Sequence, residues 1–218
     1  MTGGFRLRNI QEECERIIDA PNICLETSRT GEHYRLARFH TNQYYNISSA
    51  IGIGRNRAQF NELLIGKSKD QDINLHEVRV MAATGFDAGL LAGTLQHYQD
   101  FREDVRITYM HERDGELTLR DESVFGRDEG VLIVHTVAVS FNGVERAIRL
   151  VQDLPSQPYV AGFLVLLDRS PVGSQWRKRF IAFKHAIGMH RPIEAYHSEE
   201  ECPSCEKGIR LLDVREAA

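Results

Sequence analysis

The sequence predicts an α/β domain whose parallel central sheet is flanked by helices. Two continuous apolar runs, residues 131–134 and 163–167, are typical of strands that are buried on both faces. Helical patterns alternate with these runs, as they do in strand–helix–strand units. With 218 residues and an apolar content of 42%, the chain is long enough for one core domain with additions at both ends.

The first third of the chain is expected to contain two helices separated by extended segments. Residues 9–25 ("NIQEECERIIDAPNICL") space apolar side chains at helical intervals until Pro21 breaks the pattern. Residues 33–47 ("HYRLARFHTNQYYNI") alternate polar and aromatic side chains, which predicts extended chain or a short hairpin. Residues 58–68 ("AQFNELLIGKS") form an amphipathic helical pattern.

The rest of the chain uses a strand–loop–helix plan twice, over residues 78–101 and 130–154. Between them, residues 105–125 predict two strands joined by a turn at Asp114-Gly115. Residues 159–170 predict another apolar strand. We expect one further helix over residues 176–188 ("WRKRFIAFKHAIG"), followed by an irregular polar tail.

The charge balance argues against broad electrostatic binding to nucleic acid or to an anionic membrane. The chain has 27 basic and 31 acidic residues, which gives a net charge of −4. No apolar run has the length of a membrane span, and the N-terminus has no signal-peptide core, so we expect a soluble cytoplasmic protein. The four cysteines of such a chain are expected to be reduced.

Two loops are expected at the carboxyl ends of the strands, where open α/β sheets bind ligands. They are residues 82–89 ("AATGFDAG") and 135–143 ("HTVAVSFNG"), whose small residues let backbone N–H groups approach a phosphate. Neither loop has the dinucleotide fingerprint or the P-loop pattern, so ordinary tight turns remain the alternative. The candidate ligand-binding residues are Thr84, Gly85, Asp87, His135, Thr136, Ser140, Asn142 and Gly143.

Six segments, taken in order, resemble the type I phosphoribosyltransferases, and above all their orotate phosphoribosyltransferase-like branch. They are an entry segment (39–47, "FHTNQYYNI"), a pyrophosphate loop (82–93), a two-stranded flap (107–120), the signature strand and loop for phosphoribosyl pyrophosphate (130–151), a core strand ending in Asp-Arg-Ser (163–170) and a Cys-Pro-x-Cys tail (200–208).

The resemblance implies a single domain with a core over about residues 49–170 and a small hood from about residues 1–48 and 171–218. It further implies a homodimer and, for an active enzyme, a substrate that is handled as a magnesium complex. The entry segment adds His40, Tyr44, Tyr45 and Asn46 as site residues, and the flap adds Arg113.

The signature loop departs from the family pattern at several positions. The family's two acidic residues fall on His135 and Thr136, and two of its loop glycines fall on Phe141 and Asn142. A bulky side chain such as Phe141 hinders the close approach of a backbone to phosphate. In the flap, the family's basic residue falls on Glu112, with Arg113 beside it.

The sequence therefore predicts a catalytically degenerate phosphoribosyltransferase-like protein. It is expected to bind a nucleotide, a phosphorylated ligand or a protein partner as a regulatory or assembly component. One alternative is an active enzyme that transfers phosphoribose from phosphoribosyl pyrophosphate to an orotate-like nucleobase. Another is a nucleic-acid-associated subunit of a multi-protein system, such as a defence system, which rests on fold-level analogy.

Two further features carry alternatives. Cys202 and Cys205 have zinc-knuckle spacing, and His190, His197 and the N-terminal cysteines are candidates to complete a four-ligand site; the alternative is a turn with two thiols.

Residues 176–191 are rich in basic side chains and could contact nucleic acid, or could form an amphipathic surface helix with partly buried aromatic residues. The basic side chains are Arg177, Lys178, Arg179, Lys184, His185 and Arg191.

Two histidines have structural alternatives to a functional role. His135 follows a buried strand and has no carboxylate partner nearby in sequence, so the simpler interpretation is that it makes a structural hydrogen bond. His40 belongs to the entry segment, and a dimer or subdomain contact is its alternative.

Overall fold

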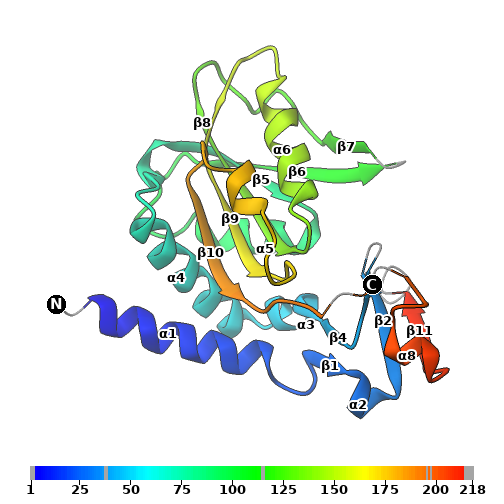
Figure 1. The fold of residues 1–218 in the computed structure, drawn as a ribbon. Helices are drawn as coiled ribbons and strands as arrows, with labels where there is room; N and C mark the ends of the chain where they lie inside the picture. The colour runs from blue at the N-terminus through cyan, green and yellow to red at the C-terminus, as the bar shows by residue number, and fades with distance from the viewer. Residues whose placement is uncertain (1–2, 37–38, 114–115, 195, 197, 214–218) are drawn as a thin grey trace.

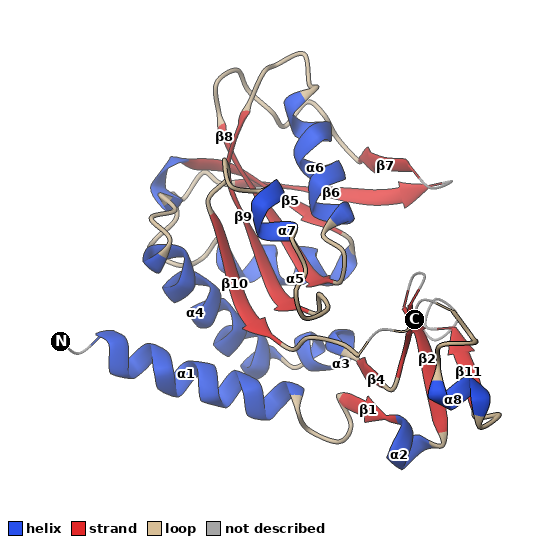
Figure 2. Cartoon of the chain, in the orientation of Figure 1, coloured by secondary structure: helices blue, strands red, loops and turns tan. Residues whose placement is uncertain are grey.

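The computed structural model describes residues 3–36, 39–113, 116–194, 196 and 198–213, and a six-stranded sheet forms its centre (Figures 1 and 2). The strands are β5 (Val78–Thr84), β6 (Arg106–Arg113), β7 (Glu116–Leu119), β8 (Gly130–Ala138), β9 (Tyr159–Asp168) and β10 (His185–His190). They lie in the order β10-β9-β8-β5-β6-β7, and every neighbouring pair is parallel except β6 and β7. The predicted α/β class with a parallel central sheet is confirmed.

Helices cover both faces of this sheet, and the strands divide their side chains between two apolar clusters. Leu132 and Val134 pack with α4 (Gly54–Asp70) and α5 (Phe86–Leu95) on one face. Val131 and Ile133 pack with α6 (Asn142–Gln152) on the other face. Because alternate residues of a strand point to opposite faces, the continuous apolar run of β8 fills both clusters.

Most of the remaining elements come from the two ends of the chain. Helix α1 (Gly3–Ile18) packs on α4, and its Cys14 and Ile18 are buried in the first cluster. The short elements are β1 (Cys24–Glu26), α2 (Thr27–Thr30), β2 (Glu32–Leu36), β3 (Phe39–Thr41), β4 (Gln43–Tyr45), α3 (Ile47–Gly52), the 3-10 helix at Leu75–Glu77, α7 (Trp176–Arg179), α8 (Pro203–Glu206) and β11 (Arg210–Asp213).

A small three-stranded sheet, called the terminal sheet below, consists of β2, β3 and β11 (Figure 1). Strands β2 and β3 are antiparallel, which confirms the expected hairpin in residues 33–47, and β11 is parallel to β2. Strands β1 and β4 form a separate antiparallel pair. The turn expected at Asp114-Gly115 lies outside the described residues, although β6 and β7 on either side of it are paired as a hairpin requires.

The prediction of a helix over residues 176–188 is wrong. Only α7 is helical, and β10 forms the edge of the central sheet beside β9. A Cβ at Gly188 would lie 2.7 Å from the carbonyl oxygen of Leu166, so glycine lets the two strands approach. Pairing with β9 therefore overrides the helical spacing of the apolar residues.

None of the described helices is both long and apolar enough to cross a membrane.

Candidate ligand-binding site

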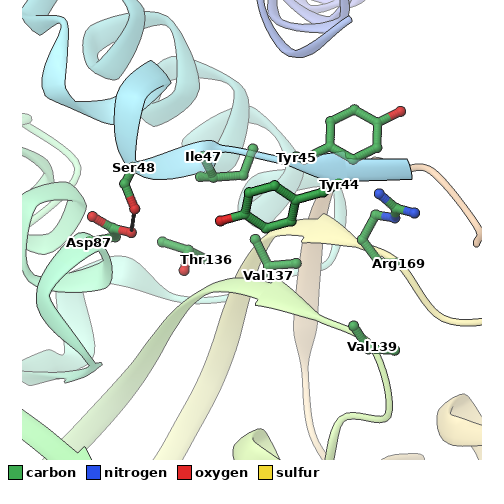
Figure 3. A pocket seen from close by; sticks show the side chains of 9 residues that line it. All are labelled: Tyr44, Tyr45, Ile47, Ser48, Asp87, Thr136, Val137, Val139 and Arg169. Carbon is green, nitrogen blue, oxygen red and sulfur yellow. Dashed lines mark hydrogen bonds between the residues drawn. The ribbon is translucent and has the colours of Figure 1, made fainter. Parts of the chain in front are cut away.

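A pocket of about 260 Å³ lies at the carboxyl ends of β8 and β9 (Figure 3). Five chain segments meet there, as expected for the edge of an open α/β sheet at which ligands bind. They contribute Tyr44 and Tyr45 from β4, Ile47 and Ser48 from α3, Asp87 from α5, Thr136, Val137 and Val139 from β8 and its loop, and Arg169 from the residue after β9. Four residues proposed from the sequence, Tyr44, Tyr45, Asp87 and Thr136, are thus brought together.

Arg169 is the charged residue of this pocket that sequence reasoning missed. Its side chain is only 1% exposed, and its guanidinium carbon lies 4.4 Å from the centre of the Tyr45 ring. Within the described part of the chain, its Nε and Nη2 atoms have no hydrogen-bond partner. Burial lowers the pKa of Arg169 to about 10, so it still carries its positive charge at neutral pH.

The carboxylate next to Arg169 in the chain is used elsewhere. Asp168 lies 3.0 Å from His190 Nδ1 and accepts a 2.8 Å hydrogen bond from the backbone N–H of Ser170. The guanidinium of Arg169 therefore lines the pocket and lies against the face of Tyr45. It has no acidic partner among the residues described here.

The opposite side of the pocket supplies hydroxyl and carboxylate groups. Ser48 Oγ donates a 2.5 Å hydrogen bond to Asp87 Oδ2 (Figure 3). In Figure 3 the hydroxyl of Tyr44 points toward the side of the pocket lined by Asp87 and Thr136. Burial, together with the negative charge of Asp87, raises the pKa of Tyr44, so this phenol stays protonated and can donate.

The loop after β8 turns its aromatic side chain away from solvent. Phe141 is 1% exposed and stacks on Trp176, with ring centres 3.9 Å apart and planes 12° from parallel. Its backbone has φ 61°, in the left-handed region that favours glycine. Burial of the ring offsets a backbone cost of about 1–2 kcal/mol.

The polar groups of the same loop are bound by Arg179. This guanidinium donates to the backbone oxygen of Ser140 at 3.3 Å and to Asn142 Oδ1 at 3.1 Å, and it forms an ion pair with Glu145. Ser140 and Asn142 do not line the pocket. The loop is therefore held by contacts within the protein.

His135, Thr84 and Gly143 form a packed group below the loop. Thr84 Oγ1 contacts His135 Nδ1 and donates to the backbone oxygen of Val134 at 3.2 Å. A Cβ at Gly143 would lie 3.4 Å from the His135 ring. Loss of solvent around the imidazole lowers the pKa of His135 to about 4, so it is neutral at pH 7.

Other residues proposed from the sequence lie outside the pocket lining. Gly85 begins α5 with φ 99°, and its N–H donates to the backbone oxygen of Met110 at 3.0 Å. Asn46 caps α3, because its side chain accepts a hydrogen bond from the N–H of Ser49 at 3.2 Å. Arg113 ends β6, but its side chain is outside the described part, and Glu112 pairs with Arg146 at 2.9 Å.

The residues at the end of β8 do not fit the magnesium complex that the family resemblance implies. Mg²⁺ binds carboxylate, phosphate and water oxygens in octahedral geometry. The two positions in question hold a neutral imidazole, His135, and a hydroxyl, Thr136. Among the described residues that line the pocket, Asp87 is the one carboxylate, and it accepts the hydrogen bond of Ser48.

A second cluster of possible ligands lies away from this pocket. The ligand atoms of His33, His40, Cys202 and Cys205 all lie within 4.8 Å of one another. Cys202 and Cys205, proposed from the sequence, lie in this cluster, whereas the proposed partners His190, Cys14 and Cys24 do not. His190 pairs with Asp168, the N-terminal cysteines Cys14 and Cys24 are in the first core cluster, and His197 lies outside the described residues.

The basic segment 176–191 is divided between α7, a turn and β10. Arg179 pairs with Glu145, and Arg191 pairs with Asp19 and Glu15. Lys184 donates to the backbone oxygen of Asp72. Acidic residues thus already neutralise two of the arginines that would contact a phosphate backbone.

Comparison with known proteins adds evidence on the fold. No family model and no curated protein sequence matches the chain. Solved structures do match: an orotate phosphoribosyltransferase from Aeropyrum pernix has 14% identity and a TM-score of 0.57 over 83% of this chain and 93% of that one. The orotate phosphoribosyltransferase of Mycobacterium tuberculosis H37Rv, in complex with inorganic phosphate, has 17% identity and a TM-score of 0.56 over 84% and 95%.

An adenine phosphoribosyltransferase from Thermoanaerobacter pseudethanolicus also matches, with 14% identity and a TM-score of 0.51 over 69% of this chain and 87% of that one. The chain has the fold of the type I phosphoribosyltransferases.

Proposed function

We propose that this protein binds a small anionic ligand of the nucleotide class in the Arg169 pocket and does not transfer phosphoribose. In this proposal it is a regulatory or assembly component built on a phosphoribosyltransferase fold. The observation that carries the proposal is the buried, charged guanidinium of Arg169, whose Nε and Nη2 atoms have no hydrogen-bond partner among the described residues.

An anionic ligand follows from the free energy of that group. A buried charge without a partner is unfavourable, and a phosphate or carboxylate with two hydrogen bonds to guanidinium removes this penalty. Tyr44, Thr136 and the Ser48–Asp87 pair supply donors and acceptors for the polar edge of a base. The pocket volume of about 260 Å³ is near the lower end of typical ligand pockets, at roughly 300 Å³, and suits a small ligand.

The loop after β8 supports the part of the proposal that the protein does not transfer phosphoribose. Phe141 stands where glycine would let the backbone approach a phosphate, and Arg179 binds Ser140 and Asn142. Removing one preorganised transition-state contact typically costs about 2.7–4 kcal/mol, and here the carboxylates and the loop are altered together. Such effects are not additive, but each acts in the same direction.

Isothermal titration with uridine monophosphate, orotate and phosphoribosyl pyrophosphate, each with and without Mg²⁺, tests the proposal. We expect binding of at least one of these probes without a requirement for Mg²⁺. Arg169→Met is expected to raise Kd by roughly 10- to 150-fold, as expected from the loss of a charged hydrogen bond of about 1.5–3 kcal/mol. Arg55→Met is the matched control, because Arg55 is exposed and outside the pocket lining.

A pyrophosphate-release assay addresses the transferase alternative. Phosphoribosyl pyrophosphate, Mg²⁺ and a panel of nucleobases are expected to give no release above the protein-free rate. Mg²⁺-dependent release that Ser140→Ala abolishes would show an active enzyme and refute the proposal. Equal binding by wild-type protein and Arg169→Met would place the ligand elsewhere.

A further inference from the structure

Among the described residues, the terminal sheet has no apolar cluster of its own. Neither of the two apolar clusters formed by described residues includes a residue of β2, β3, α8 or β11. The buried side chains of this region are largely polar, and burying polar groups does not by itself stabilise a fold. They are His33, Tyr34, His40, Thr41, Cys202 and Ser204.

Four of the side chains in this region converge on one point. His33 Nε2 and His40 Nδ1 each lie 3.2 Å from Cys205 Sγ, and all four ligand atoms of the cluster lie within 4.8 Å of one another. Three of the four residues are almost fully buried: His33 and Cys202 are 1% exposed and His40 is 5% exposed. Tetrahedral zinc with bonds of about 2.0–2.3 Å separates its ligand atoms by about 3.3–3.8 Å, which small side-chain rotations reach from this arrangement.

The positions of the ligands follow from the strand pairing. Arg35 on β2 is opposite His40 on β3, so His33, two residues earlier, lies diagonally from His40 on the same face of the hairpin. Cys202 and Cys205 lie at the start of α8 and within it, and α8 precedes β11, which pairs with β2. The strand pairing therefore places the two histidines on one face and returns the segment that carries the two cysteines to β2.

We propose that His33, His40, Cys202 and Cys205 bind one Zn²⁺ ion in a closed structural site. Two thiolates and two imidazoles are a common ligand set for structural zinc, and two thiolates neutralise the charge of the ion. Four protein ligands leave no position for water or substrate, so the site is not catalytic. The ion joins the C-terminal segment to the β2–β3 hairpin and thereby stabilises the terminal sheet.

Metal analysis of the purified full-length chain is the first test. We expect about one zinc ion per chain after desalting, as for a single closed site. Cobalt added to zinc-stripped protein is expected to give a thiolate-to-metal charge-transfer band and the intense visible bands of tetrahedral Co²⁺, and zinc is expected to displace it. Wild-type protein that has no zinc and gives no cobalt spectrum would overturn the proposal.

Variants assign the ligands. Cys205→Ser and His33→Ala are expected to lower the zinc content severalfold, whereas His97→Ala keeps it, because His97 is exposed on a helix-following turn far from this cluster in the fold. Unchanged zinc in Cys205→Ser would place the ion elsewhere. The cobalt spectrum of wild-type protein gives an answer even if a variant does not fold.

A chelator and a protease report what the ion does. Chelation is expected to speed cleavage in residues 198–213 severalfold while the circular dichroism of the central sheet and its helices persists. The metal site would be contradicted by a Cys202–Cys205 disulfide in protein that has been kept under reducing conditions. Such a disulfide would lower the intact mass by two hydrogens.

Discussion

Replacing Arg169 with methionine is expected to stabilise the ligand-free protein, although it removes the group proposed to bind the ligand. Arg169 is buried, and two of its nitrogens have no partner among the described residues. Its backbone N–H donates to Ala138 at 2.7 Å, and this bond does not depend on the side chain. Methionine has a similar length and no charge, so the substitution isolates the guanidinium.

The size of the effect follows from two opposing terms. The fall in the pKa of Arg169 to about 10 corresponds to an unfavourable free energy of about 3 kcal/mol, at about 1.4 kcal/mol per tenfold change. The contact with the Tyr45 ring, which is lost, stabilises the wild type by about 0.5–2 kcal/mol. We therefore expect a net gain of about 1–2.5 kcal/mol, and a rise in Tm of about 2–10 °C for a chain of this size.

Urea unfolding of extensively dialysed protein, followed by circular dichroism, measures this difference. Arg55→Met serves as the control and is expected to stay within about 0.5 kcal/mol of wild type. A loss of more than about 1 kcal/mol in Arg169→Met, the cost of a broken hydrogen bond, would mean that the guanidinium is paired in the ligand-free protein. The argument for an anion site would then fail.

Four further substitutions, at three positions, test the loop after β8, the end of β8 and the entry segment. Phe141→Ala is expected to destabilise the protein by about 3–5 kcal/mol. Phe141→Gly is expected to destabilise it by about 1 kcal/mol less, because glycine accepts φ 61°. If urea unfolding shows Phe141→Gly to be the less stable variant, the left-handed backbone at position 141 is contradicted. Because His135 titrates near pH 4 when folded and near 6.5 when unfolded, its contribution is complete above pH 6.5 and falls as pH drops toward 4. Wild type should therefore lose up to about 2 kcal/mol more than His135→Gln between pH 7 and 5, and equal losses in parallel denaturation curves would refute this. Asn46→Ala should lower stability by about 1 kcal/mol through loss of the α3 cap while ligand affinity in the titration stays unchanged; a large loss of affinity would return Asn46 to the binding site.

The central sheet was predictable because its signals are local. The runs at residues 131–134 and 163–167 are apolar throughout, since both faces of β8 and β9 are covered. Strand β10 was not predictable in the same way, because its partner β9 precedes it by a turn and a short helix, and its local spacing also fits a helix. Pairing between strands that are separated in the sequence is decided by the fold.

The pocket was only partly predictable for a related reason. Tyr44, Tyr45, Asp87 and Thr136 were named because they follow the carboxyl ends of strands or belong to the entry segment. Arg169 also follows a strand, but its importance depends on burial against Tyr45, which comes from a distant part of the chain. The roles of His33 and His40 likewise depend on the return of the C-terminal segment to β2.

The changes in the loop after β8 depend on one another, and this argues that they form one altered structure. Phe141 stacks on Trp176 and contacts Phe180, so its ring helps to position α7 beside the loop. Arg179, at the end of α7, can reach Ser140 and Asn142 only from that position. A glycine at position 141 would therefore remove the ring and with it the contact that holds α7, and Arg179, beside the loop. The two positions at the end of β8 would still lack carboxylates, because they hold His135 and Thr136. In the proposed function, an ordinary transferase loop is thus several coupled substitutions away, whereas the Arg169 pocket is already formed.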